Sequence, residues 1–183
     1  MELKNYQKQV LADLSRYLDC LNETQSLPDA YRNFWREKGI SVGFGGVPAY
    51  QNTLPGVPTI CAKVPTGGGK TLLACHSIRP IFDGLPSTKT KVVVWLVPSD
   101  AILTQTLAAL RNPAHPYRQC IDVDFGNRVE VYTKDQLLSG QNFNPTSVTE
   151  QLSICVLSYD SFRGRKESLK AKRENSALAA FAD

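Results

Sequence analysis

The residues that point most directly to chemistry form one short stretch in the first half of the chain. It consists of Pro65, Thr66, Gly67, Gly68, Gly69, Lys70 and Thr71. Glycines have no Cβ, so the backbone can turn sharply here and bring several N–H groups up to a phosphate. Lys70 would add a full charge near the β- and γ-phosphates of a nucleotide, and the Thr71 hydroxyl would take one position on Mg²⁺. The stretch therefore predicts a phosphate-binding loop.

The flanks of this loop supply the elements that it requires. An apolar, β-leaning run from Ile60 to Val64 predicts a strand before it, and an apolar pattern predicts a helix from about Thr71 to Arg79-Pro80. The N-terminus of such a helix directs N–H groups and a partial positive charge at an anion. The general pattern has one more glycine, at the place that Val64 occupies here. The alternative is a glycine-rich turn whose lysine is merely solvated, and the matching flanks argue against it.

Three apolar runs in the second half of the chain predict further strands, at residues 91–97, 128–132 and 153–157. The first is almost continuously β-branched, so we expect it to be buried on both faces of a parallel sheet. Ser99 or Asp100 is expected to cap a helix that ends before Pro113, and Thr133 a short helix that ends at Gly140. This alternation predicts an α/β fold with a mostly parallel sheet, helices on both faces, and ligands beyond the carboxyl ends of the strands.

The remaining segments are expected to be a helix, a long connection and a tail. Residues 5–21 carry apolar side chains at helical spacing, at Tyr6, Val10, Leu14, Leu18 and Leu21. Residues 22–58 form a long insertion or loop, in which Asp29 could cap a short helix through Lys38 and the aromatic side chains would pack on the domain. Residues 163–183 form a basic, helical tail. We expect residues 1–183 to make up a single lobe.

Composition excludes several classes of protein. The 183 residues are 42% hydrophobic and 21% charged, as in an ordinary globular protein, and no apolar run approaches a membrane span. Five scattered cysteines and two histidines give almost no support to a zinc or haem site. Cys61, Cys75 and Cys155 lie in apolar runs, which indicates buried, reduced thiols. We therefore expect a cytoplasmic protein with no membrane partner.

Four stretches resemble the motifs of superfamily 2 DEAD/DEAH-type helicases and translocases. The loop PTGGGKT is similar to their motif I, and PSDAILTQ, residues 98–105, is similar to motif Ia. LKNYQ near the start resembles their LRxYQ opening, and SYDSF, residues 158–162, resembles a TYxSF turn. The style of these turns is most similar to the Res subunit of type III restriction enzymes. The resemblance implies the first RecA-like lobe of a P-loop motor, a three-layer fold.

The resemblance also implies roles for particular residues. All seven loop residues would bind ATP with Mg²⁺, held by Thr71, and Lys70 and Thr71 would have catalytic roles. Gln7 would recognise adenine, since a glutamine amide offers one donor and one acceptor; the alternative is a surface helix residue. The nucleic-acid backbone would be contacted by Pro98, Ser99, Gln105 and Ser158; the alternative is an ordinary strand-to-helix turn. The implied partners are double-stranded DNA and a methyltransferase (modification) subunit.

One part of such a motor is missing from the sequence. ATP hydrolysis needs a carboxylate at the end of a core strand to hold Mg²⁺, and no DExH or DExD pattern is present. Asp160 is the remaining candidate, although it follows its strand two residues late. The chain therefore looks like a motor lobe truncated before motif II, nearly inactive by itself and lacking the second lobe. A P-loop phosphotransferase or kinase and a non-catalytic nucleotide-binding scaffold remain as alternatives.

Overall fold

The computed structural model describes residues 2–140 and 145–162, and the chain divides into two compact units after Ser87. Each unit is built from its own elements and is described by itself. The predicted basic tail, residues 163–183, lies outside the described residues. The expectation that both units belong to one lobe stays a prediction.

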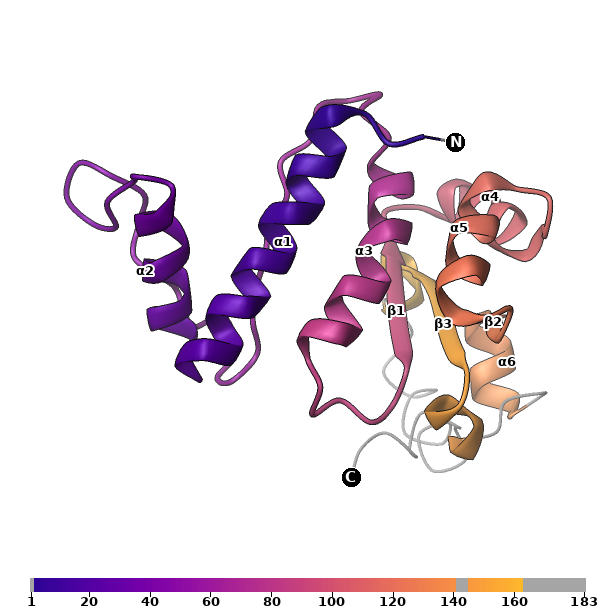
Figure 1. Ribbon diagram of the computed structural model, residues 1–183. Coiled ribbons are helices and arrows are strands. Elements are labelled where there is room, and N and C mark those ends of the chain that lie inside the picture. Colours follow the sequence, from indigo (N-terminus) through magenta and orange to yellow (C-terminus); the bar gives the residue numbers. More distant parts are fainter. Residues whose placement is uncertain (1, 141–144, 163–183) are drawn as a thin grey trace. The chain divides into compact units, whose positions relative to one another are not determined.

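Three helices make up most of the first unit (Figure 1). Helix α1 spans Asn5–Thr24, α2 spans Leu27–Glu37 and α3 spans Lys70–Gly84. Helix α1 packs against both others. Tyr17 and Cys20 of α1 are buried with Ala30 of α2, and the rings of Tyr17 and Phe34 meet edge to face at 5.9 Å. The helix expected at residues 5–21 is confirmed, but its predicted buried face is only partly so: Leu18 is buried, whereas Tyr6 is 39% exposed.

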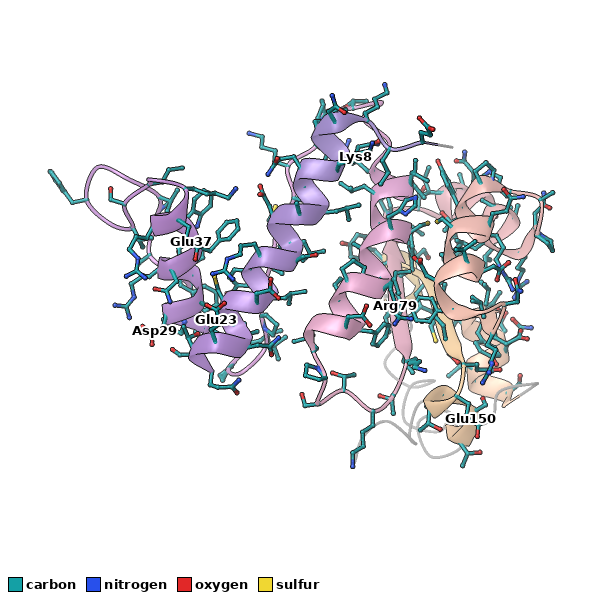
Figure 2. All side chains as sticks on the ribbon, viewed as in Figure 1. Lys8, Glu23, Asp29, Glu37, Arg79 and Glu150 are labelled. Carbon is teal, nitrogen blue, oxygen red and sulfur yellow. The ribbon has the colours of Figure 1, made fainter. Side chains whose placement is uncertain are left out.

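Polar contacts also join α1 to α2. Arg16 of α1 donates to Glu23 at 2.8 Å and to Glu37 of α2 at 2.7 Å, and both carboxylates are labelled in Figure 2. The hydrogen bond from Arg16 lowers the pKa of Glu37. All three side chains are solvent-exposed, so the contact orients the two helices more than it stabilises them.

The start of α2 differs from the prediction. Asp29 does not cap this helix; the N-cap is Ser26, whose hydroxyl accepts from the Asp29 N–H at 3.4 Å. The helix begins earlier because Pro28 lies in its first turn, where a residue without an N–H loses no hydrogen bond. In the connection after α2, Tyr50 packs on Tyr31 of α2 with ring centroids 5.6 Å apart, so part of the connection is packed as expected, but Phe44 is fully exposed.

Helix α3 also extends further than expected. It was predicted to end near Arg79-Pro80, but Pro80 lies inside it and the helix continues to Gly84. A proline removes one helical hydrogen bond, and contacts on both sides of it hold the helix together. Arg79 pairs with Asp83 across the proline at 2.8 Å, and Gly84 lies so close to α1 that an added Cβ would be 2.7 Å from the Leu18 side chain.

The strand predicted at residues 60–64 is not formed. Ile60 and Cys61 are exposed, and Val64 alone of this run is buried. A strand requires a neighbour for its N–H and C=O groups. In the described part of the first unit, pairing is limited to one isolated bridge, Val42–Val47, so this segment has no strand within its own unit to pair with.

The second unit contains a three-stranded parallel sheet in the order β1-β3-β2 (Figure 1). Strand β1 spans Val92–Val97, β2 spans Val129–Tyr132 and β3 spans Leu152–Ser158. The connections between them contain the helices α4 (Asp100–Arg111), α5 (Pro116–Phe125) and α6 (Lys134–Ser139), and the 3₁₀ turn Pro145–Thr149; a second 3₁₀ turn, Tyr159–Phe162, follows β3. The predicted strands, their parallel pairing and the Thr133 capping box are confirmed.

Burial differs between the strands. Every residue of β3 is buried, so both faces of this central strand are covered, as a three-layer fold requires. Strand β1 was predicted to be buried on both faces, but Val94 and Leu96 are 54% and 44% exposed. These two residues share one face because side chains alternate along a strand. Strand β1 lies at the edge of the sheet, and its apolar composition alone did not specify what covers each face.

The cysteines, helix α5 and the absence of a membrane span in the described part of the chain can also be compared with the sequence. Cys75 and Cys155 are buried thiols as expected, but Cys61 is exposed. Helix α5 was not predicted, although its N-cap His115, the following Pro116 and the left-handed Gly126 at its end are helix boundary signals. Among the described residues, no helix is both long and apolar enough to cross a membrane.

Candidate nucleotide site and strand-edge turn

The glycine loop forms a concave set of backbone donors at the start of α3. Gly67 and Gly69 have φ angles of +74° and +71°, which a residue with a Cβ rarely adopts. Gly69 is the N-cap of α3, and no side chain caps this end. The first N–H groups of the helix therefore have no intrahelical acceptor, and they lie at its positive end. An anion is the ligand that this arrangement suits.

Lys70 lies on the same loop with its side chain exposed. Its Nζ donates to the Pro65 carbonyl at 2.9 Å, and the Gly68 N–H donates to the same carbonyl at 3.0 Å. These bonds close the loop on itself. An ammonium group has three N–H donors, so Lys70 keeps two of them for an anion. The predicted residues from Pro65 to Thr71 therefore lie together in one turn, with Pro65 and Thr66 exposed.

Thr71 is the one predicted magnesium ligand in this loop. It is half-buried in the first turn of α3, and its hydroxyl is the hard oxygen donor that Mg²⁺ prefers. Among the described residues, no three His, Cys, Asp or Glu side chains gather where they could hold a metal. The described residues therefore fit Mg²⁺ in part: Thr71 offers one ligand, and phosphate oxygens and water would supply others.

The first turn of α1 lies against the glycine loop, as the neighbouring starts of α1 and α3 in Figure 1 show. Gln7 is 4% exposed; its Oε1 accepts from the Lys4 N–H and its Nε2 donates to the Gly68 carbonyl, both at 2.9 Å. The Tyr6 hydroxyl donates to the same carbonyl at 2.6 Å. One N–H and one lone pair of the Gln7 amide are left over, so its contact with adenine stays a prediction.

A cavity of about 580 Å³ also adjoins Lys70 in the first unit. Its walls come from α1, α2, α3 and residues 59–64, and they are mainly apolar. Two lining residues, Tyr17 and Trp35, hold buried polar atoms that have no hydrogen-bond partner in the described part of the chain, and burial raises the pKa of Tyr17 to about 12. Apolar walls do not suit a triphosphate, so the loop and not this cavity stays the predicted phosphate site.

The second unit presents a different site, at the carboxyl edge of its sheet. Strands β1 and β3 end side by side, with Val97 paired to Ser158. Ser99 is the N-cap of α4, and its hydroxyl accepts from the Ile102 N–H at 3.5 Å. The Ser158 hydroxyl donates to Asp100 Oδ1 at 2.7 Å. This bond ties the end of β3 to the first turn of α4 and fixes the strand-edge turn, residues 98–100.

Comparison with known proteins identifies the family of this chain. The family model described as type III restriction enzyme, res subunit, matches residues 1–181. The chain belongs to this family. No curated protein and no solved structure matches it. Membership in the type III Res family confirms the resemblance found in the sequence and the RecA-like P-loop fold class. It also implies an ATP-binding, helicase-like lobe.

In this Res-family chain, the four residues predicted to contact nucleic acid differ in solvent exposure. Pro98 and Gln105 are exposed and Ser99 is half-buried, whereas Ser158 is 1% exposed with its hydroxyl on Asp100. Ser158 is therefore buried beneath the turn, and its contact with nucleic acid stays a prediction. The sequence placed Asp100 as a helix cap within the stretch similar to motif Ia, and its bond to Ser158 was not anticipated.

Asp160 was the remaining candidate for a carboxylate on Mg²⁺. It lies in the 3₁₀ turn Tyr159–Phe162 that follows β3, and its side chain is exposed. Its place after β3 is at the carboxyl edge of the sheet, where parallel-sheet proteins bind ligands. The magnesium role of Asp160 stays a prediction.

Proposed function

We propose that this chain is the ATP-binding lobe of an ATP-dependent DNA helicase or translocase of the type III restriction Res type, acting in the cytoplasm. One observation carries the proposal: the N-terminus of α3 has no side-chain cap and follows the glycine loop directly. Its first residue, Lys70, donates to the Pro65 carbonyl of that loop. The N–H groups and the ammonium group would bind the phosphates of ATP, and Thr71 would hold Mg²⁺. Bound Mg²⁺ would neutralise charge on the phosphates.

The strand-edge turn of the second unit supports the nucleic-acid part of the proposal. Ser99 begins α4, so the N–H groups of its first turn are suitable donors to a backbone phosphate. Gln105, exposed one turn further along α4, would extend this contact. Family membership supports a nucleic-acid partner, and the partners that we propose are double-stranded DNA and a methyltransferase subunit.

The first experiment measures ATP binding by calorimetry in the presence of Mg²⁺. Lys70→Ala should abolish most of the binding, because it removes the charge that faces the phosphates. Lys63→Ala is the matched control: Lys63 is also exposed, it lies just before the loop, and the change in net charge is the same. Equal affinity for wild type, Lys70→Ala and Lys63→Ala would refute the phosphate-loop assignment.

A second experiment tests the motor assignment. Binding of duplex DNA should weaken as salt increases, and Ser99→Ala with Gln105→Ala should reduce the affinity. ATP binding without any DNA binding, together with phosphate transfer to a small-molecule acceptor, would instead indicate a phosphotransferase.

A further inference from the structure

Two side chains of α1 hold one carbonyl of the glycine loop. The Gly68 oxygen accepts from the Tyr6 hydroxyl at 2.6 Å and from Gln7 Nε2 at 2.9 Å. A carbonyl oxygen has two lone pairs, so these two donors satisfy it fully. Tyr6 and Gln7 precede Gly68 by more than sixty residues, so the contact is a tertiary one.

The orientation of the Gln7 amide is fixed by its second hydrogen bond. Its Oε1 accepts from the Lys4 N–H, so the NH₂ group must face the Gly68 carbonyl. Gln7 is buried, whereas Tyr6 is 39% exposed. The Tyr6 hydroxyl can therefore be removed with little effect on packing.

Holding the Gly68 carbonyl also sets the direction of the next N–H. A peptide unit is planar and, in the part of the chain that the structure describes, always trans. In a trans unit the C=O and the following N–H point in opposite directions. The Gly69 N–H must therefore point away from Tyr6 and Gln7. Gly69 is the N-cap of α3, so this N–H lies next to the unbonded donors of the first helical turn.

Close packing keeps α1 against the loop. A Cβ on Gly68 would lie 2.7 Å from Val64 Cγ1 and 2.9 Å from the Pro65 carbonyl oxygen, and a Cβ on Gly69 would lie 2.7 Å from Gln7 Nε2. Neither glycine leaves room for a side chain. The loop is therefore packed from both sides, and the two donors of α1 decide how its peptide units are rotated.

We propose that Tyr6 is a positioning residue for the phosphate loop: its hydroxyl fixes the Gly68–Gly69 peptide so that the Gly69 N–H faces the phosphate oxygens. The inference rests on the proposed nucleotide binding at this loop. Without the hydroxyl, Gly68 keeps Gln7 as its single donor and the peptide can rotate more freely. Binding of a phosphate chain then weakens, while any contact made by the base is unaffected.

The test compares wild type with Tyr6→Phe in calorimetric titrations of Mg²⁺-ATP and of inorganic tripolyphosphate, which has no base. Loss of one hydrogen bond is worth about 0.5–1.5 kcal/mol, so both ligands should bind about two- to twelvefold more weakly. Tyr31→Phe is the matched control, because the Tyr31 hydroxyl also donates to a backbone carbonyl of the first unit, that of Pro48, at 3.0 Å. It should bind both ligands as wild type does.

The outcomes separate the inference from the proposed function. If Lys70→Ala loses ATP and Tyr6→Phe binds it as wild type does, the positioning role is wrong and the phosphate loop stands. If Tyr6→Phe weakens ATP but not tripolyphosphate, Tyr6 acts on the base and the inference fails. If Tyr6→Phe lowers the melting temperature of the unliganded chain and Tyr31→Phe weakens binding equally, the role is merely structural. If wild type binds neither ligand through Lys70, the inference and the proposed function fail together.

Discussion

Strand β3 contains two buried serines that should respond oppositely to the same substitution. Ser158 donates to Asp100 Oδ1 at 2.7 Å, whereas the buried hydroxyl of Ser153 has no hydrogen-bond partner among residues 2–140 and 145–162. Both side chains are at most 1% exposed. Replacement by alanine removes one oxygen atom in each case, so the comparison isolates the hydrogen bond from the loss of volume.

The expected magnitudes follow from these surroundings. A hydrogen bond to a charged group contributes about 1.5–3 kcal/mol. Asp100 is exposed, so water can solvate its carboxylate once Ser158 is lost, and Ser158→Ala should lower the free energy of unfolding by about 1–2 kcal/mol. A buried, unbonded hydroxyl costs about 1–3 kcal/mol. Ser153→Ala should therefore leave stability unchanged or raise it by about 1 kcal/mol, after the small cavity is subtracted.

The assay is equilibrium unfolding in urea, followed by tryptophan fluorescence. Trp95 lies in β1 opposite Val156 of β3, so a Trp35→Phe background makes the signal report the sheet alone. A change in the midpoint at constant m value measures stability. If Ser153→Ala destabilises the sheet as much as Ser158→Ala does, the bond to Asp100 is not the source of the stability.

Three further predictions concern binding, reactivity and turnover. Gln7→Ala should weaken ATP by about 1–3 kcal/mol and remove any preference over GTP if Gln7 reads adenine; equal losses for both nucleotides would show that it acts through Gly68 alone. Iodoacetamide at pH 8 should modify the exposed Cys61 rapidly, whereas Cys75 and Cys155 should react only after unfolding, since burial raises the pKa of Cys155 to about 11; mass spectrometry that finds labelled Cys155 in folded protein would contradict this. The chain alone should hydrolyse ATP very slowly, because its sequence shows no motif II carboxylate; rapid, DNA-stimulated turnover that Lys70→Ala abolishes would overturn this expectation.

The elements that the sequence predicted well are those specified by local patterns. Strand β3 and the capping box of Thr133 with Gln136 depend on residues within a few positions of one another, and both are confirmed. The glycine turn also formed as expected, since glycine permits the positive φ angles that Gly67 and Gly69 adopt. Fold class could therefore be predicted from short-range information, and family membership agrees with it.

The elements that failed depend on what lies around them. Residues 60–64 have the composition of a strand, but a strand also needs a paired neighbour, which composition does not supply. A proline disfavours the interior of a helix, yet α3 continues beyond Pro80 because its tertiary contacts stabilise it. The prediction for β1 failed for the same reason. Apolar side chains favour burial, but they do not determine which element covers them.

The largest gap between sequence and structure lies in how α1 meets the glycine loop. Helical periodicity placed Tyr6 on the buried face, and the resemblance to known motors assigned Gln7 to adenine. Neither argument involved Gly68, more than sixty residues away, whose carbonyl accepts from both side chains. Every residue has a backbone carbonyl, so the residue type at position 68 could not indicate that this carbonyl accepts two hydrogen bonds. Because the peptide is trans, the hydrogen bonds to the Gly68 carbonyl also set the direction of the Gly69 N–H. The phosphate binding that we propose for the loop would therefore depend on α1 as well as on the seven residues that identified it.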